Sequence, residues 1–491
     1  MKGYLLGIDN GLTATKAVVY DLMGSELGVY SSTTPVVNKR SGFSEIDPHQ
    51  QWQKVCIVVK GVIEKTGVSP KDILGVGVSG YGNGLYLLDS DKKPFKKAIT
   101  SMDHRAAGMV DAVDMEVEEE LKKLTLQGVW DAQPGILLKW FKENELSDYK
   151  EINTVFFCKD WIRYCLTGQI KTEYSDISAS GLLNNRTRVY DKNILELLDI
   201  PEIKDKMPEV ISSYDVAGYI TKQAAKETML KHGTPVVSGL FDVTANSIGS
   251  GLVSQKQFCS IAGTWNINIA LSKSCIIPER IRQCTVYADD NFYSYIDSSA
   301  TSSSNLEWFM QNVLSGGCSY DDFERIIAQY GPDDVEIMFM PFIYSGLKND
   351  NPGAVFYGLK SFHGKDDMLR AVAEGIGFAH YYHIKNLVQE GIGGNTVLLT
   401  GGASKNKKWC QLMADIMQMK IEVPESDQTG ALGVCIMAGV GTGVFGDIRS
   451  AVKNMVKIKQ VYEPDPDNKD VYQKKYKRFL ELLKSQDNII N

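Results

Sequence analysis

A pattern of strand, short glycine- and threonine-rich turn, and strand occurs twice in this 491-residue chain, at its start and just past its middle. The first copy predicts strands over 4–9 and 17–21 around a turn that contains Asn-Gly, a strong hairpin signal. The second copy predicts strands over 257–262 and 266–271, where apolar and polar residues alternate with the period of a half-buried strand. The chain should therefore consist of two related halves that each open with a hairpin.

Chain length also points to two domains, because a single hydrophobic core stops growing at roughly 250–300 residues. Apolar runs and helical periodicity alternate between and after the two hairpins: strands are expected near 75–79, 235–239, 336–341 and 396–400, and helices near 47–67, 134–144, 305–313 and 366–390. This alternation is typical of an α/β fold. We expect domains at residues 1–248 and 249–491, a hinge near 246–254, and a C-terminal helical tail.

Composition narrows the function classes. A net charge of −7 gives no basic surface for nucleic acid. The nine cysteines are scattered without C-x-x-C spacing, which predicts neither a disulfide framework nor a zinc site and favours a reducing compartment. The most apolar late run, 431–445, is too short and too rich in glycine to span a bilayer. We therefore expect a cytoplasmic protein with no nucleic-acid or membrane partner.

The first turn carries the residue types that bind phosphate. A phosphate group needs closely approaching backbone N–H donors, hydroxyl groups and a cation. Gly11, Thr13, Thr15 and Lys16 supply this set, although an ordinary hairpin with a polar tip explains the loop equally well. Asp9, just before the turn, could hold Mg²⁺, which prefers one or two carboxylates plus phosphate oxygens, or it could cap the turn.

Asp242 stands where a buried strand is followed by a helix of small residues. One interpretation is a helix N-cap, because aspartate is among the best capping residues. The other is a general base, which must be ionised to accept a proton and which a helix N-terminus keeps ionised. The two roles are compatible.

Other motifs have structural explanations. His380 and His383 are spaced as i and i+3 on a helix, but no third metal ligand is near in sequence, which favours a core or surface pair. The basic run 92–97 is interpreted as a solvated turn. The apolar stripe that begins at Trp409 is interpreted as core.

The order of these motifs resembles the FGGY family of carbohydrate kinases over nearly the whole chain. The late family signature is nearly complete over 354–374, with Ala373 smaller than usual. Residues 138–144 fit the earlier signature, but Leu137 stands where family members usually have lysine. Leu12 likewise replaces a small or hydroxyl residue.

The resemblance implies two actin-like, ribonuclease-H-like domains that close over ATP, Mg²⁺ and a sugar, with the active site in the cleft between them. It makes Asp242 the catalytic base and, with Asp9, a metal ligand. The nucleotide contacts expected from the turns and the resemblance together are Thr13, Thr15, Lys16, Gly263, Thr264, Gly402 and Asn406. The partners are thus a small sugar and ATP, and a homodimer is left open.

Substrate choice depends on loops. Glycerol kinases carry Arg-Glu after the strand at 75–79, and D-xylulose kinases carry Met-His; this chain has Gly-Tyr-Gly-Asn-Gly at 80–84 and matches neither. Segments 239–243, 263–265 and 304–309 look like those of the L-xylulose kinase branch. The predicted sugar contacts are Asn83, Asp103, Arg105, Trp130, Trp265 and Asp242, with a structural ion pair as the alternative for Asp103 and Arg105.

The predicted function is ATP-dependent phosphorylation of a small sugar at a terminal hydroxyl, with L-xylulose or a related keto-sugar acid as the leading substrate. Another pentulose, an erythritol-like polyol or gluconate is the alternative within the family. An actin-like ATPase or a sugar-binding regulator without catalysis is the alternative from another class, because a fold alone does not fix a function.

Overall fold

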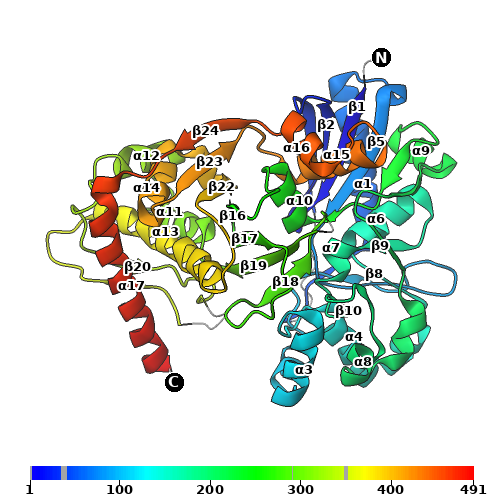
Figure 1. Cartoon of the computed structure of the whole chain (residues 1–491), viewed down its shortest axis with the longest axis horizontal. Coiled ribbons are helices and arrows are strands. Elements are labelled where there is room, and N and C mark those ends of the chain that lie inside the picture. Colours follow the sequence, from blue (N-terminus) through cyan, green and yellow to red (C-terminus); the bar gives the residue numbers. More distant parts are fainter. Residues whose placement is uncertain (1–2, 35–40, 290, 348–351, 491) are drawn as a thin grey trace. The chain divides into compact units, whose positions relative to one another are not determined.

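The computed structural model describes residues 3–34, 41–289, 291–347 and 352–490 (Figure 1). The chain forms two compact units. Unit 1 contains Met1–Val253, Ser272–Ser294 and Gln428–Lys457, and unit 2 contains Ser254–Leu271, Tyr295–Asp427 and Ile458–Asn491. This division differs from the single boundary predicted after residue 248, because two later segments pack with the N-terminal part.

Unit 1 is built on a seven-stranded sheet in the order β13-β14-β5-β1-β2-β3, with β15 also paired to β5. These strands are β1 (Tyr4–Asn10), β2 (Ala14–Asp21), β3 (Glu26–Thr33), β5 (Ile73–Gly80), β13 (Val216–Tyr219), β14 (Pro235–Val237) and β15 (Leu240–Phe241). The main helices are α1 (Pro48–Thr66), α4 (Pro134–Asn144), α6 (Cys158–Thr167), α7 (Tyr174–Ile177), α9 (Lys222–Thr228), α10 (Asp242–Gly249), α15 (Thr429–Gly441) and α16 (Ile448–Met455).

Smaller elements of unit 1 surround this sheet and these helices. The short strands are β4 (Glu45–Ile46), β6 (Tyr86–Leu88), β7 (Ala98–Ile99), β8 (Thr154–Phe156), β9 (Lys171–Glu173), β10 (Leu183–Asn184), β11 (Val189–Tyr190), β12 (Glu209–Ile211) and β18 (Gln283–Val286). The short helices are α2 (Ala107–Asp111), α3 (Met115–Thr125), α5 (Leu146–Glu151) and α8 (Lys192–Leu197).

Helix α1 shows how local sequence sets an element's limits. The Asp47 side chain accepts hydrogen bonds from the backbone N–H groups of His49 and Gln50, and Pro48 occupies the first turn. Gly67 ends the helix with φ of 65°, a left-handed conformation that glycine adopts without steric penalty. The predicted helix over 47–67 is therefore confirmed to within one residue at each end.

Three parallel strand ends meet at one edge of the unit 1 sheet. Strand β1 pairs with β5 so that Asp9 lies beside Ser79, and β15 pairs with β5 so that Leu240 lies beside Ser79 from the other side. The hairpin partner β2 places Lys16 opposite Asp9. Since Asp242 directly follows β15, this register brings Asp9 and Asp242 to the same edge.

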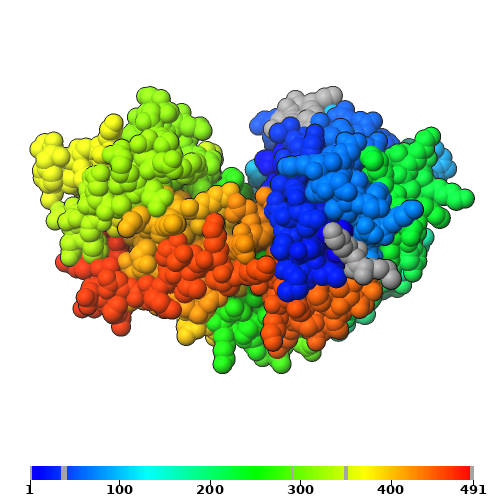
Figure 2. Space-filling view, turned by 90° about the horizontal axis from the view of Figure 1, so that it is seen from above, coloured from blue at the N-terminus to red at the C-terminus, as the bar shows by residue number. Residues whose placement is uncertain are grey.

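Helix α15 returns from late in the sequence and packs on β1, β5 and α10 through glycines (Figure 1). A Cβ added at Gly7 would lie 2.3 Å from the carbonyl oxygen of Ala431, and one at Gly77 would lie 2.2 Å from that of Val434. In the space-filling view the orange late segment lies directly against the blue N-terminal strands (Figure 2). Backbone therefore packs on backbone here, which only residues without a Cβ allow.

Substitution of Gly433 should destabilise unit 1. A Cβ at this position would lie 2.0 Å from the carbonyl oxygen of Ala245 on α10, so Gly433→Ala must push the two helices apart. Overpacking of this kind costs about 1–3 kcal/mol. We expect Gly433→Ala to lower the midpoint of thermal unfolding by several degrees. Gly446→Ala is the control, because a Cβ there meets no atom within 4 Å; equal midpoints for the two variants would contradict the close approach.

Unit 2 repeats the plan of unit 1. Strands β16 (Gln257–Ala262) and β17 (Asn266–Ser272) form an antiparallel hairpin, and β16 pairs in parallel with β22 (Thr396–Thr400). Six strands run in the order β19-β17-β16-β22-β23-β24, where β19 is Tyr293–Ser299, β23 is Lys420–Pro424 and β24 is Ile458–Tyr462. The two predicted hairpins and their equivalent positions are thereby confirmed.

Helices flank the sheet of unit 2: α11 (Ser303–Asn312), α12 (Tyr320–Ile327), α13 (Lys365–Gln389), α14 (Lys407–Met417) and α17 (Lys469–Ile490), with a small ribbon of β20 (Met338–Met340) and β21 (Val355–Tyr357). The stripe that begins at Trp409 is core, as predicted, since Trp409 is 1% exposed. His380 and His383 are completely buried on α13, which agrees with a core pair. No described helix is long and apolar enough to cross a membrane.

Candidate active site

Asp9 lies near the end of β1 with its orientation fixed by a neighbour. The Ser79 hydroxyl donates a 2.7 Å hydrogen bond to Oδ1 of Asp9. Burial raises the pKa of the Asp9 carboxyl, while the Ser79 hydrogen bond and the charge of Lys16 oppose that rise. Gly430, at the start of α15, leaves the other carboxylate oxygen room, because a Cβ there would lie 3.0 Å from Oδ2.

Asp242 is the first residue of α10, and the N-cap position belongs to Phe241. The interpretation of Asp242 as a simple N-cap is therefore wrong by one residue. Burial raises the pKa of the Asp242 carboxyl to about 8; the negative charge of Asp9 adds to the rise, as does that of Asp176, and a hydrogen bond from the Val243 backbone opposes it. The repulsion between Asp9 and Asp242 shows that two carboxylates of this edge interact.

This pair of carboxylates fits a divalent cation. Both pKa values are raised, chiefly because burial disfavours the ionised forms, and a nearby cation would offset that cost. Mg²⁺ is typically held by one or two carboxylates together with phosphate oxygens. Within the described ranges no group of three or more His, Cys, Asp or Glu side chains could hold a metal by itself. Asp9 and Asp242 are therefore the residues of unit 1 that suit Mg²⁺.

A buried cluster of charged residues anchors the chain just before Asp242. The backbone N–H of Phe241 donates to Oγ of Ser175 at 3.0 Å, and Ser175 Oγ donates to Glu173 at 2.8 Å. Lys159 lies 3.5 Å from Glu173 and 3.1 Å from Asp176, and all three side chains are at most 1% exposed. The strand end that carries Asp242 is thus held by side chains as well as by the sheet.

The hairpin turn between β1 and β2 keeps most of the predicted phosphate contacts at the surface. Thr13 is exposed, and Lys16 is partly exposed on the strand that follows. Thr15 differs, because its hydroxyl is fully buried and donates a 2.6 Å hydrogen bond to Oδ1 of Asn10. Thr15 therefore supports the turn from inside, and its predicted contact with phosphate stays a prediction.

The second turn and the adenosine motif, which is residues 401–406 with the predicted nucleotide contacts Gly402 and Asn406, lie at neighbouring strand ends of unit 2. Gly263 is partly exposed and Thr264 is exposed, while the parallel pairing of β16 with β22 brings Gly401 and Gly402 to the same edge. Asn406 is 6% exposed, and its side chain caps α14 by accepting a 2.9 Å hydrogen bond from the Trp409 backbone. The Asn406 side chain therefore has a structural role as a helix cap, and its predicted nucleotide contact stays a prediction.

Asn83 has the features of a ligand contact in the loop after β5. Its φ of 62° is unusual for a residue other than glycine. Its Oδ1 is buried and has no hydrogen-bond partner in the part of the chain that the structure describes. The next residue, Gly84, donates its N–H to the Ala132 carbonyl at 2.9 Å, which places the loop beside the segment that carries Trp130.

Asp103 and Arg105 form the structural ion pair that was the alternative to sugar binding. Oδ1 of Asp103 accepts from Nε of Arg105 at 2.9 Å, and the Arg105 guanidinium also bonds Glu45 at 2.9 Å. Arg105 further lies 4.2 Å from the ring centroid of Phe43, in cation–π contact, and its side chain is only 2% exposed. These contacts fix the position of the segment that carries Asp103 and Arg105. Trp130 is partly exposed and Trp265 is 38% exposed, so both rings are accessible.

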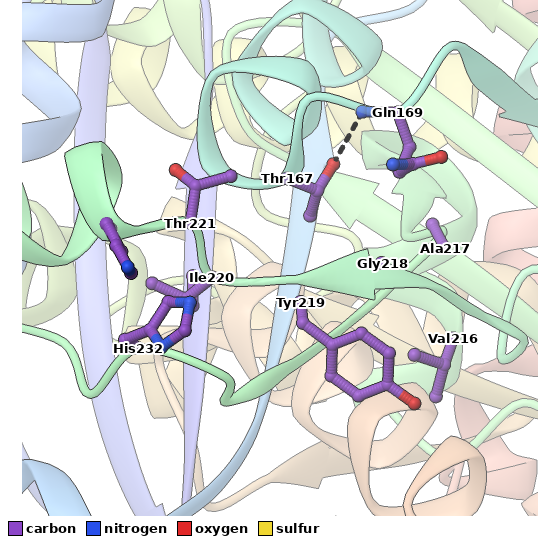
Figure 3. Close-up of a pocket in the computed structure, with 10 residues that line it drawn as sticks. Thr167, Gln169, Val216, Ala217, Gly218, Tyr219, Ile220, Thr221 and His232 are labelled. Atoms are coloured by element: carbon purple, nitrogen blue, oxygen red, sulfur yellow. Dashed lines mark hydrogen bonds between the residues drawn. The ribbon is translucent and has the colours of Figure 1, made fainter.

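An open hollow of about 550 Å³ lies at the end of β13, outside this site (Figure 3). It is lined by residues such as Thr167, Gln169, Tyr219, Thr221, Lys222 and His232. The Gln169 backbone N–H donates to Oγ1 of Thr167 at 3.2 Å on its rim. None of its lining residues is a predicted site residue, and its polar groups do not converge on a common point.

Three residues of this edge were missed by sequence reasoning. Ser79 could have been found from its place at the end of a strand parallel to β1. Gly430 and Thr429 belong to a run with glycines at 430 and 433, whose i, i+3 spacing is a signal for close helix packing. Thr429 donates a 2.7 Å hydrogen bond to Oδ1 of Asn246 and so ties α15 to α10.

Comparison with known proteins gives matches over nearly the whole chain. A model of the N-terminal domain of the FGGY family of carbohydrate kinases matches residues 4–249, and a model of the C-terminal domain of the same family matches residues 259–442. The L-xylulose/3-keto-L-gulonate kinase of Escherichia coli (strain K12) is 34% identical over 485 residues, 98% of this chain and 97% of that protein.

Two further matches agree with these. A probable L-xylulose kinase of Haemophilus influenzae is 32% identical over 489 residues, 99% of each chain. Among solved structures, the ligand-bound xylulose kinase from Lactobacillus acidophilus has a TM-score of 0.91 at 23% identity and covers 98% of each chain. The sequence matches and the structural match therefore each extend over both units.

Proposed function

Because the chain belongs to the FGGY family of carbohydrate kinases, we propose that it transfers the γ-phosphoryl group of ATP to a terminal hydroxyl of an L-ketopentose or a related keto-sugar acid. Membership confirms the predicted sugar kinase activity and the two-domain α/β fold. The observation that carries the choice of sugar is the 34% identity to an L-xylulose/3-keto-L-gulonate kinase.

Asp242 is the proposed general base. In the reaction the sugar hydroxyl oxygen forms a bond to the γ-phosphorus, the bond from that phosphorus to the β,γ-bridging oxygen breaks, and the hydroxyl proton passes to the Asp242 carboxylate. The strand-to-helix junction supports this role, because the Phe241 N–H and the Val243 N–H hold the backbone and side chain on either side. A base whose pKa is near the working pH accepts a proton efficiently.

Asp9 and Asp242 are the proposed ligands for Mg²⁺, which when bound would neutralise phosphate charge. Ser79 keeps Oδ1 of Asp9 occupied and leaves Oδ2 free for the ion or its water. A cation beside both carboxylates would favour their ionised forms and so prepare Asp242 to accept the proton. Lys16, opposite Asp9 in the sheet, and Thr13 are the proposed phosphate contacts of unit 1.

Gly263, Thr264 and Gly402 are the proposed nucleotide contacts of unit 2. A Cβ added at Gly263 would meet no atom within 4 Å, so the backbone there has open space for a phosphate group. Asn83, Trp130 and Trp265 are the proposed sugar contacts. Asp103 and Arg105 are proposed to act indirectly, by holding the segment that faces the loop of Asn83.

A panel of sugars tests this function. ADP release should be stimulated most by L-xylulose or a keto-sugar acid, and less by D-xylulose, glycerol, erythritol and gluconate. Asn83→Ala should raise the KM for the sugar by roughly tenfold, because it removes one or two hydrogen bonds, and should leave the KM for ATP unchanged. Asn153→Ala is the control, because Asn153 is an exposed residue outside the proposed sugar contacts. No stimulation by any sugar of the panel would contradict the kinase function, and a preference for a polyol would contradict the proposed substrate.

A further inference from the structure

A serine-rich segment lies directly behind the second turn, in the loop that leads into α11. The Ser303 backbone N–H donates to the Gly263 carbonyl at 3.0 Å, and Ser303 Oγ donates to the Ala262 carbonyl at 3.2 Å. Ser304 Oγ donates to the Thr264 carbonyl at 2.9 Å. Three consecutive carbonyl groups of the turn therefore point at these two serines.

The planarity of the peptide unit fixes where the opposite groups point. In a trans peptide the N–H of each residue points away from the carbonyl of the residue before it. The N–H groups of Gly263, Thr264 and Trp265 must then face away from the serines, and none of them donates a hydrogen bond in the described part of the chain. Successive free N–H groups form a concave site for an anion.

Ser303 also stands at the junction of the two nucleotide motifs. A Cβ added at Gly402 would lie 3.8 Å from Ser303 Oγ and 3.9 Å from the Ala262 carbonyl oxygen. Gly401, with φ of 91°, packs even closer, since its Cβ would lie 2.6 Å from the same oxygen. One hydroxyl group is thus in contact range of the turn and close to the start of the adenosine motif.

Two buried histidines of α13, His380 and His383, contact the serine segment. Ser302 Oγ lies 3.2 Å from Nε2 of His380, whose pKa burial lowers to about 3, so the ring stays neutral. His383 contacts Ser299 at 2.7 Å, and Ser299 in turn contacts Thr301 at 2.8 Å. The segment is therefore a rigid support, and the predicted histidine pair belongs to it.

We propose that Ser303 and Ser304 are positioning residues for ATP, which hold the carbonyl groups of the second turn back so that its N–H groups face the phosphates. This inference rests on the proposed nucleotide role of Gly263 and Thr264. Neither serine touches the nucleotide in this arrangement. Loss of the two hydroxyls releases the Ala262 and Thr264 carbonyls, while the Ser303 backbone N–H still holds that of Gly263. The released peptide units can rotate, and a carbonyl oxygen turned towards a phosphate repels it.

Ser304→Ala should raise the KM for ATP and the Kd for ADP by about threefold to tenfold, which corresponds to one hydrogen bond. The double variant Ser303→Ala/Ser304→Ala should raise both by more than tenfold, with the KM for the sugar unchanged. Ser304→Thr keeps the hydroxyl and should restore most of the affinity. Ser485→Ala is the matched control, because Ser485 is also in unit 2 and its hydroxyl also donates to a backbone carbonyl, that of Glu481 on α17, away from the serine segment and the second turn.

The Kd for ADP, measured by calorimetry, tests the proposed role of the serines without depending on catalytic activity. If Ser304→Ala and the double variant bind ADP within twofold of Ser485→Ala, the positioning role is wrong. If the double variant does not fold, the single Ser304→Ala variant decides alone. If the wild-type protein binds ADP but shows no sugar-stimulated turnover, the proposed function is contradicted and the comparison of the serine variants is still valid. If the wild-type protein does not bind ADP, the proposed role of the serines is wrong.

Discussion

Asp242→Asn should lower kcat for sugar phosphorylation by about 10³-fold, towards the upper part of the range for general acid–base groups, while ADP binding stays within twofold of the wild-type protein. Asparagine has nearly the same shape as aspartate and preserves the first turn of α10, but its amide does not accept the sugar proton. The loss should appear in kcat because proton transfer accompanies attack on phosphorus.

Steady-state kinetics with sugar and ATP, together with calorimetry of ADP, check this result. Asp447→Asn is the matched control, because Asp447 also stands at the start of a helix of unit 1, where it caps α16. Asparagine is an equally good cap, so this variant should keep full activity and stability. An Asp242→Asn protein with more than a tenth of the wild-type kcat would falsify the role of Asp242 as the base.

The same variant should change how stability depends on pH in the metal-free protein. The pKa of the folded Asp242 carboxyl, about 8, lies above its ordinary value of 3.8, so the protonated form stabilises the fold. This contribution is complete below pH 3.8 and is lost as the pH rises to about 8. Asparagine does not titrate, so the melting temperature of Asp242→Asn relative to wild type should rise by several degrees from pH 5 to pH 9. A constant difference would mean that the surroundings of Asp242 do not raise the pKa of its carboxyl.

The two hairpins and most helices could be predicted from sequence because their signals are local. Alternation over 257–262 and 266–271 gives strands, and Asp47 with Gly67 marks both ends of α1. The division into units could not be predicted in this way. Residues 428–457 join unit 1 because Gly7, Gly77 and Gly433 permit backbone contacts with α15 or α10 that no periodicity records.

The candidate site was predictable where a residue acts through its position in a motif. Asp9 and Asp242 were proposed as site residues in this way, and the register of β1, β5 and β15 explains why they share one edge. Side-chain direction was not predictable: Thr15 turns inward to Asn10, and Arg105 is occupied by Asp103 and Glu45. These directions depend on neighbours far away in the sequence.

The hinge predicted near 246–254 stays a prediction, and only part of that segment suits it. Residues 246–249 belong to α10, where a Cβ at Gly249 would lie 1.9 Å from the Thr429 carbonyl oxygen. A helix packed this closely against α15 has little freedom to bend. In this segment the chain passes from unit 1 to unit 2 between Val253 and Ser254, so the predicted hinge is better assigned to the residues after α10.

Asp9→Asn should lower kcat/KM by about 10²–10³-fold, because a bound metal ion provides several kcal/mol of charge stabilisation in the transition state and each 1.36 kcal/mol is about tenfold in rate. Its signature should differ from that of Asp242→Asn. The concentration of Mg²⁺ that gives half-maximal activity should rise strongly, since one of two proposed carboxylate ligands is lost. Binding of ADP without Mg²⁺ should not change.

Ser79→Ala distinguishes the effect of the Asp9 charge from the effect of the orientation of its carboxylate. This variant removes the 2.7 Å hydrogen bond to Oδ1 but keeps the carboxylate, so activity should fall by about tenfold or less. Gly430→Ala should have an intermediate effect, because its methyl group would lie 3.0 Å from Oδ2, on the side proposed to face the ion. Titrations of activity with Mg²⁺ for the three variants rank these effects. If Asp9→Asn keeps the wild-type requirement for Mg²⁺, Asp9 does not hold the ion. If Ser79→Ala loses as much activity as Asp9→Asn, the role of Asp9 is to shape the strand end rather than to supply charge.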